Sequence, residues 1–211
     1  MALTLSQATA DVRQLLNEDT AVFWTDAEIE DWIAEGTRII ASKTLCVEAD
    51  DNLTLATGQL NYTSSDAAWI ADCLEPYAAI YNDGSGNHKG IQFIHPKQLG
   101  NVQTFTDGPP RYYSFHNRTF YVWPLPTATE NGNNILILYA SESDDVTALK
   151  DEFQHLAILW AFAKAKEKDM KFGEAGALKG QFYSELNFER ADKSTRPGES
   201  TKDVKTGMPA R

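Results

Sequence analysis

The stretch RYYSFHNRTFYVWPLPT, residues 111–127, contains six aromatic residues, a reversal at His116-Asn117 and two closing prolines. Such a stretch is either a binding face for sugar or nucleic acid, or the core of a small sheet. Large residues on both sides of a short polar reversal predict a β-hairpin. Proline cannot donate to a strand ladder, so we expect Pro124 and Pro126 to end the second strand.

The faces of this hairpin bear on its role. If Tyr112-Tyr113 pairs with Phe120-Tyr121, Tyr113 faces Phe120, Tyr112 faces Tyr121, and aromatic residues occupy both faces. A base- or sugar-stacking platform would instead gather them on one exposed face. Aromatic residues on both faces suit a hairpin that is buried on one face by its own domain and on the other face by something else. We therefore take Tyr112, Tyr121 and Trp123 as candidate contact residues, and keep a carbohydrate-binding face as an alternative.

Strand-like patterns extend on both sides of the hairpin. Residues 52–63 predict two short strands around Thr57-Gly58, and residues 68–95 predict further strands with a Gly-rich reversal. Residues 96–105 are typical of one or two helical turns. The run 135–139 is apolar on both faces, which predicts a central strand.

Helical periodicity frames this region. Residues 4–17 and 26–45 carry apolar residues at helical spacing, and Thr25 and Glu28 form a capping box. The same spacing returns in residues 151–192. We predict an α+β protein: an antiparallel helical bundle of the N- and C-terminal helices, a large antiparallel β-rich insertion, and an extended C-terminal tail. The predicted parts are residues 1–48 (N-terminal helices), 49–143 (β-rich insertion), 144–192 (C-terminal helices) and 193–211 (tail).

Charge is distributed unevenly along the 211 residues. The net charge is −11, yet residues 193–211 contain five Lys or Arg against two acidic residues, a net charge of +3. The other residues therefore carry −14, which repels phosphates and argues against a domain that grips DNA or RNA. No window approaches the ~20 apolar residues of a membrane helix, and no signal peptide opens the chain. We expect synthesis in the cytoplasm and no membrane partner.

The residues that could hold a metal are scattered. The loop from Asp83 resembles a calcium loop at its first positions, but His88 stands where glycine is needed and Ile94 where a bidentate glutamate is needed. We expect a plain hairpin loop there. The four histidines lack the spacing of a zinc site: His88, His95, His116 and His155.

Catalytic signatures are likewise missing from the sequence. There is no phosphate-binding glycine loop, no dinucleotide fingerprint and no nucleophile elbow. Cys46 and Cys73 are expected to be small buried side chains, not a disulfide framework. We expect no enzyme, no metal and no cofactor.

The order of these parts resembles the head-to-tail adaptor (connector) proteins of tailed bacteriophages. The resemblance rests on LSQATADVRQLLNE, WTDAEIEDWIAEGTRIIASKT, LTLATGQLNYT, PPRYYSFHNRTFYVWPLPT, ILILYASESDD and LKDEFQHLAILWAFAKAKEKD in that order, and it covers about residues 3–192. It implies a structural virion protein at the neck, in a ring of twelve copies below the portal, through whose lumen DNA passes without specific binding. The helices would form the ring body.

The resemblance also implies a role for the tail, which would insert into the portal. Its candidate docking residues are Arg196, Pro197, Lys202, Lys205, Met208 and Arg211. Tyr112, Tyr121 and Trp123 would then touch the neighbouring subunit or the next tail or neck component. Another tail or baseplate subunit remains the alternative within the virion, and a carbohydrate-binding module the alternative outside it.

Overall fold

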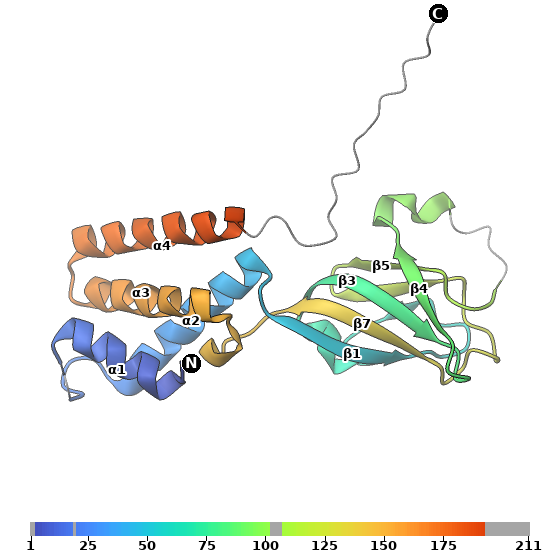
Figure 1. Cartoon of the computed structure of the whole chain (residues 1–211), viewed down its shortest axis with the longest axis horizontal. Helices are drawn as coiled ribbons and strands as arrows, with labels where there is room; N and C mark the ends of the chain where they lie inside the picture. The colour runs from blue at the N-terminus through green and yellow to red at the C-terminus, as the bar shows by residue number, and fades with distance from the viewer. Residues whose placement is uncertain (1–2, 19, 102–106, 193–211) are drawn as a thin grey trace, which may run out of the picture.

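The computed structural model describes residues 3–18, 20–101 and 107–192, and it divides them into a helical half and a sheet half (Figure 1). The protein is α+β. Four α-helices and a curled sheet of seven strands make up the described residues. The helices are α1 (Leu5–Leu16), α2 (Asp26–Thr44), α3 (Asp151–Lys168) and α4 (Phe172–Asp192).

Local sequence sets where the first two helices begin. At α2 the Thr25 hydroxyl accepts a hydrogen bond from the Glu28 N–H, and the Glu28 carboxylate accepts one from the Thr25 N–H, so the predicted capping box is confirmed. A second capping box, Thr4 with Gln7, starts α1. All four helices contribute to one hydrophobic cluster, which is centred on residues such as Ile33, Phe153 and Trp160.

The strands are ordered β1-β7-β3-β4-β5-β6-β2 in space. Their bounds are β1 (Glu48–Thr54), β2 (Asn61–Tyr62), β3 (Cys73–Asn82), β4 (His88–Phe93), β5 (Tyr112–His116), β6 (Thr119–Trp123) and β7 (Asn134–Ser141). β7 lies between β1 and β3, which confirms the predicted central strand. The prediction of a wholly antiparallel insertion is wrong at one place, because β4 and β5 are parallel. The long connection between them, which includes the short 3-10 helix η2 (Pro96–Asn101), permits this crossover.

The curled sheet encloses a second hydrophobic cluster. Alternate residues of the strands point inward, among them Leu53, Ile137 and Phe120. The short 3-10 helix η1 (Ala68–Ala71) adds Trp69 and Ile70 to this cluster. The two clusters share no residue, so each half has its own core.

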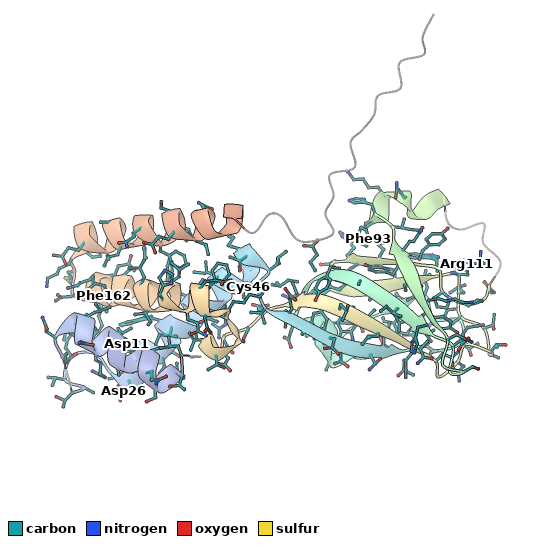
Figure 2. All side chains as sticks on the ribbon, viewed as in Figure 1. Asp11, Asp26, Cys46, Phe93, Arg111 and Phe162 are labelled. Carbon is teal, nitrogen blue, oxygen red and sulfur yellow. The ribbon has the colours of Figure 1, made fainter. Side chains whose placement is uncertain are left out.

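Two chain segments join the halves at a narrow waist, where Figure 2 labels Cys46. The Ser141 N–H donates to the Val47 carbonyl (2.8 Å), which holds the two segments together. Ion pairs flank them: Lys150 with Glu48 (3.0 Å) and Arg38 with Asp144 (2.9 Å). Cys46 and Cys73 are buried, as expected. No described helix is long and apolar enough to cross a membrane.

Candidate contact surfaces

The tail residues named from the sequence lie outside the described residues. This holds for Arg196, Pro197, Lys202, Lys205, Met208 and Arg211, all of which fall within 193–211. Their docking role stays a prediction.

The aromatic hairpin is present, but its predicted register is wrong. Tyr113 lies opposite Val122 and Phe115 opposite Phe120, because Asn117 and Arg118 (φ 50° and 52°) form the two-residue turn. The predicted reversal lay one residue earlier. Each residue lies opposite a partner two positions away from the predicted one. Because side chains alternate with a period of two, every side chain stays on its predicted face. Tyr113 and Phe120 stack at 5.4 Å on the inner face.

Tyr112, Tyr121 and Trp123 share the other face of the hairpin. Trp123 lies opposite Tyr112 and stacks on Tyr121 with ring centroids 5.7 Å apart. Trp123 is only 7% exposed, whereas Tyr112 and Tyr121 are half-buried. Ser114, on the same face, is fully buried, and its hydroxyl has no hydrogen-bond partner among the described residues. An open stacking platform for sugars is therefore not formed here, because such a platform needs exposed rings.

A second surface, not predicted from the sequence, lies at the end of the helical half far from the sheet. There the α1–α2 connection and the α3–α4 turn come together (Figure 1). Four large apolar residues of these two segments are exposed: Val22 (83%), Phe23 (49%), Met170 (78%) and Phe172 (67%). We call these four residues the distal tip. Large exposed apolar residues gathered on two neighbouring segments are candidates for an interaction site.

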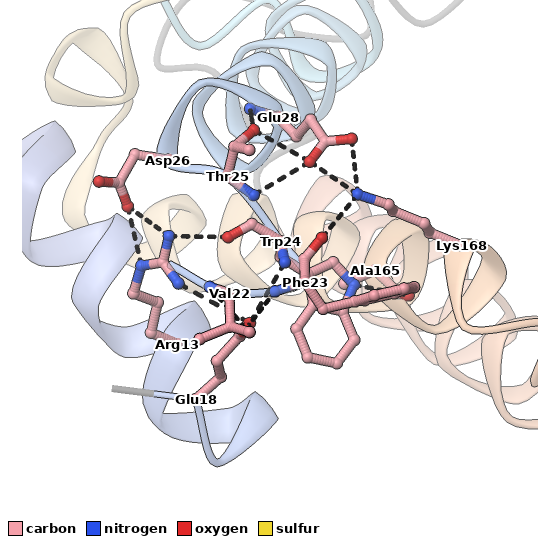
Figure 3. Close-up of polar contacts among 10 residues, drawn as sticks. All are labelled: Arg13, Glu18, Val22, Phe23, Trp24, Thr25, Asp26, Glu28, Ala165 and Lys168. Carbon is pink, nitrogen blue, oxygen red and sulfur yellow. Dashed lines mark hydrogen bonds and ion pairs between the residues drawn. The ribbon is translucent and has the colours of Figure 1, made fainter. Parts of the chain in front are cut away.

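Polar contacts fix the α1–α2 connection in place (Figure 3). The Glu18 carboxylate accepts hydrogen bonds from three consecutive backbone N–H groups, those of Val22, Phe23 and Trp24. Arg13, which is buried, donates to the Trp24 carbonyl (3.0 Å) and to the Asp26 carboxylate. The backbone that presents Val22 and Phe23 is thus held before any partner arrives.

Lys168, at the end of α3, ties this connection to the α3–α4 turn. Its ammonium donates to the Glu28 carboxylate (2.7 Å) and to the Phe23 carbonyl (2.8 Å), and it lies 4.9 Å from the centre of the Phe23 ring (Figure 3). The Trp24 indole N–H donates to the Ala165 carbonyl (3.3 Å). These contacts bring residues some 140 positions apart in sequence together at one end of the bundle.

Two carboxyl groups of this network have a lowered pKa. The Lys168 hydrogen bond, aided by those from Thr25, lowers the pKa of Glu28 from 4.5 to about 2. Burial raises the pKa of Glu18, but the three backbone N–H groups and Arg13 outweigh burial and lower the pKa overall. Both groups are therefore charged at neutral pH, and their contacts persist there.

Among the described residues, no group of three or more His, Cys, Asp or Glu side chains could hold a metal ion. The loop from Asp83 joins β3 to β4 as an antiparallel hairpin, as expected. The Asp83 carboxylate accepts hydrogen bonds from the Ser85 and Asn87 N–H groups and from the Asn87 side chain. These contacts give the Asp83 carboxylate its hydrogen-bond partners within the loop, so its position is explained without a bound metal ion.

The chain matches a known protein family. The family model described as SU10 adaptor protein matches residues 3–201. The chain belongs to this family. No curated protein matches it. Membership of the SU10 adaptor family confirms the resemblance to phage head-to-tail adaptors and makes the protein a structural adaptor of a phage virion.

Sequence reasoning about this SU10 adaptor family member missed the distal tip. Val22 and Phe23 stand in a polar loop, and Met170 and Phe172 flank a helix break, so no periodic pattern marks them. The structure adds a local signal that the sequence does not carry. Met170 adopts φ 58°, a left-handed conformation that favours glycine or asparagine, and yet it is a large apolar residue.

Proposed function

We propose that the protein is a head-to-tail adaptor that forms a ring below the portal, links the capsid to the tail and lets DNA pass. The observation that carries this proposal is the match of the adaptor family over residues 3–201, nearly the whole chain. A ring of twelve copies is the expected stoichiometry. The tail, through Arg196, Lys202, Lys205 and Arg211, would dock on the portal.

We assign a separate role to each half of the protein, because each half has its own hydrophobic core. Residues 1–48 and 144–192 would form the ring body as an antiparallel bundle, and residues 49–143 would face the neighbouring subunit or the next tail component. The charge of −14 outside the tail supports passage of DNA, because like charge prevents the duplex from adhering to the lumen.

The distal tip supports a contact role for the helical half. Its four apolar side chains are too few to form a standard interface of roughly 800 Å² per partner by themselves. Held rigidly, they suit the anchor of a larger contact, because a contact already in its bound conformation costs little ordering entropy. We place the tip in contact with another subunit of the neck. Tyr112 and Tyr121, half-buried on the sheet half, are a weaker second candidate.

The alternative within the virion is a different tail or baseplate subunit. Electron microscopy of the purified protein mixed with its portal separates the two. The adaptor function requires a ring of copies on one end of the portal. A single bound copy, or no binding to portal together with binding to a tail protein, would contradict it.

A variant with V22S and F172S together tests the tip. We expect it to fold, since both side chains are mostly exposed, and to form the ring or the neck complex less readily. Phe93 offers a matched control: it is 52% exposed but belongs to the sheet half (Figure 2), so F93S should leave tip-mediated assembly intact. Equal assembly of all three proteins would contradict a role for the tip.

A further inference from the structure

The outer edge of β1 is unpaired in the part of the chain that the structure describes. β1 is the terminal strand of the sheet order and pairs only with β7 there. Six of its seven residues have exposed or half-buried side chains, and only Leu53 is buried. An exposed edge of this length is a template for another strand.

The direction of the backbone groups along β1 follows from the bonds at its two ends. The Val47 carbonyl accepts from Ser141, and Leu55 both donates to Asn133 and accepts from Gly132, so these two residues face the β7 side. Backbone groups alternate with a period of two, and the register with β7 has no irregularity. Ala49, Asp51 and Leu53 therefore also face β7, whereas the backbone groups of the even-numbered residues point away from the sheet.

One outward N–H group, that of Asn52, already has a hydrogen-bond partner. The Asp51 carboxylate accepts a hydrogen bond from the Asn52 N–H (2.6 Å). The outward N–H groups of Asp50 and Thr54 have no such partner among the described contacts. The edge is also acidic, with Glu48, Asp50 and Asp51 in one strand. A charged edge repels a second copy of itself, but it attracts a basic strand.

A basic segment of sequence follows α4. α4 packs against α3 in the opposite direction, as the His155–Glu185 (3.2 Å) and Lys166–Glu174 (3.6 Å) pairs together show, so α4 ends on the side of the waist (Figure 1). Lys150, just before α3, contacts Glu48 at the start of β1. Residues 193–211 carry a net charge of +3 and could span up to ~60 Å when extended. A seven-residue strand needs only ~23 Å.

We propose that the C-terminal segment of the same chain binds along the free edge of β1 as an added strand. Residues 200–206, STKDVKT, are the part that fits, because they contain no proline or glycine and carry Lys202 and Lys205. Their backbone would pair with Asp50 and Thr54, and their ammonium groups would face Asp50 and Asp51. A strand that leaves the waist and runs with β1 pairs in the parallel sense.

This pairing goes beyond the proposed function and does not require a ring. In the isolated protein it covers an edge that would otherwise bind other chains. If the same segment docks on the portal, the portal must displace it from β1, and the free edge then becomes available on the assembled neck.

Amide hydrogen exchange measured by NMR on the isolated protein tests the proposal. In the full chain the Asp50 and Thr54 amides should exchange at least about ten-fold more slowly than in a chain that ends at residue 193. The Ala49 and Leu53 amides, which face β7, report in the same spectra that both proteins are folded and should not differ. Equal rates at Asp50 and Thr54 would overturn the proposal.

Two further samples make the test specific. K202E with K205E should lose the protection, whereas R211E, outside the pairing segment, should keep it. Labelled chain 1–193 mixed with unlabelled full chain should gain no protection. Protection in that mixture would mean that the strand comes from a second copy, which would overturn the assignment to the same chain. Loss of portal binding in any of these variants bears only on the adaptor function.

Discussion

At the scale of single residues, the distal tip depends on two carboxylates with different tasks. Glu18 caps the backbone of the loop, and Glu28 both caps α2 and binds Lys168. The sequence revealed the Thr25–Glu28 capping box because its partners stand three residues apart. It could not reveal the bond to Lys168, because only the folded bundle brings that residue close.

The lowered pKa of Glu28 predicts a pH dependence. The folded pKa of about 2 lies below the unfolded value of 4.5, so the stabilisation is fully present above pH 4.5 and is lost as the pH falls towards 2. E28Q should lower the urea midpoint at pH 7. When the pH falls from 5 to 3, its urea midpoint should decrease less than that of wild type. K168M keeps the capping box and should show an intermediate drop. The idea is wrong if wild type and E28Q lose stability in parallel over this range.

At the scale of elements, α2 and α3 approach closely at one glycine. A Cβ added at Gly36 would lie 2.9 Å from the Trp160 Cβ and 3.1 Å from two atoms of its ring. Trp160 is buried and cannot move aside easily. G36A should therefore destabilise the protein by about 1–3 kcal/mol despite the better helix propensity of alanine. Chemical unfolding monitored by circular dichroism measures this.

Gly180 on α4 is the matched control. It is exposed, and an added Cβ would meet nothing within 4 Å. G180A should stabilise the protein by about 0.5–1 kcal/mol, the ordinary gain of alanine over glycine within a helix. A loss of stability in G180A, or a gain in G36A, would contradict the packing described for the α2–α3 contact.

The sequence predicted where these elements lie better than it predicted which residues they contact or pair with. Apolar spacing predicted the helix of residues 26–45, but only the structure shows that Trp160 requires residue 36 to be as small as glycine. Likewise, alternation predicted both strands of the aromatic hairpin. Its register was missed because Asn117-Arg118 is a weak turn signal beside the Asn-Gly pair typical of such turns. The parallel pairing of β4 and β5 has no local signal at all, since it depends on where a long connection ends.

At the scale of the whole molecule, two cores without a shared residue predict that the helical half folds alone. Val47 and Ser141 are hydrogen-bonded neighbours, so a short Gly-Ser linker could replace the sheet half between them. The shortened protein should keep its helical circular dichroism and unfold cooperatively. A molten or insoluble product would show that the sheet half is needed for the bundle to fold, and would argue against residues 49–143 as an independent insertion.

The last prediction at this scale concerns the tail, residues 193–211. Ordering roughly 15 residues costs on the order of 15–30 kcal/mol of backbone freedom, so stable docking on a portal needs a long continuous groove and not only a few ion pairs. Deletion of residues 194–211 removes that contact but no residue of either described core. We expect a change in Tm below about 4 °C, the shift of ~1 kcal/mol in a chain of this size, together with loss of the portal complex in sedimentation.

A tail of the same composition in scrambled order separates charge from sequence. If a groove recognises the sequence of the tail, the scrambled chain should fail to bind the portal, as the deleted chain does, although its net charge is unchanged. If charge alone attracts the tail, the scrambled chain should bind and should release at raised salt. A truncated chain that joined the portal as well as the full chain would leave the tail with no part in assembly, and the distal tip and the sheet half would then be the candidate contacts.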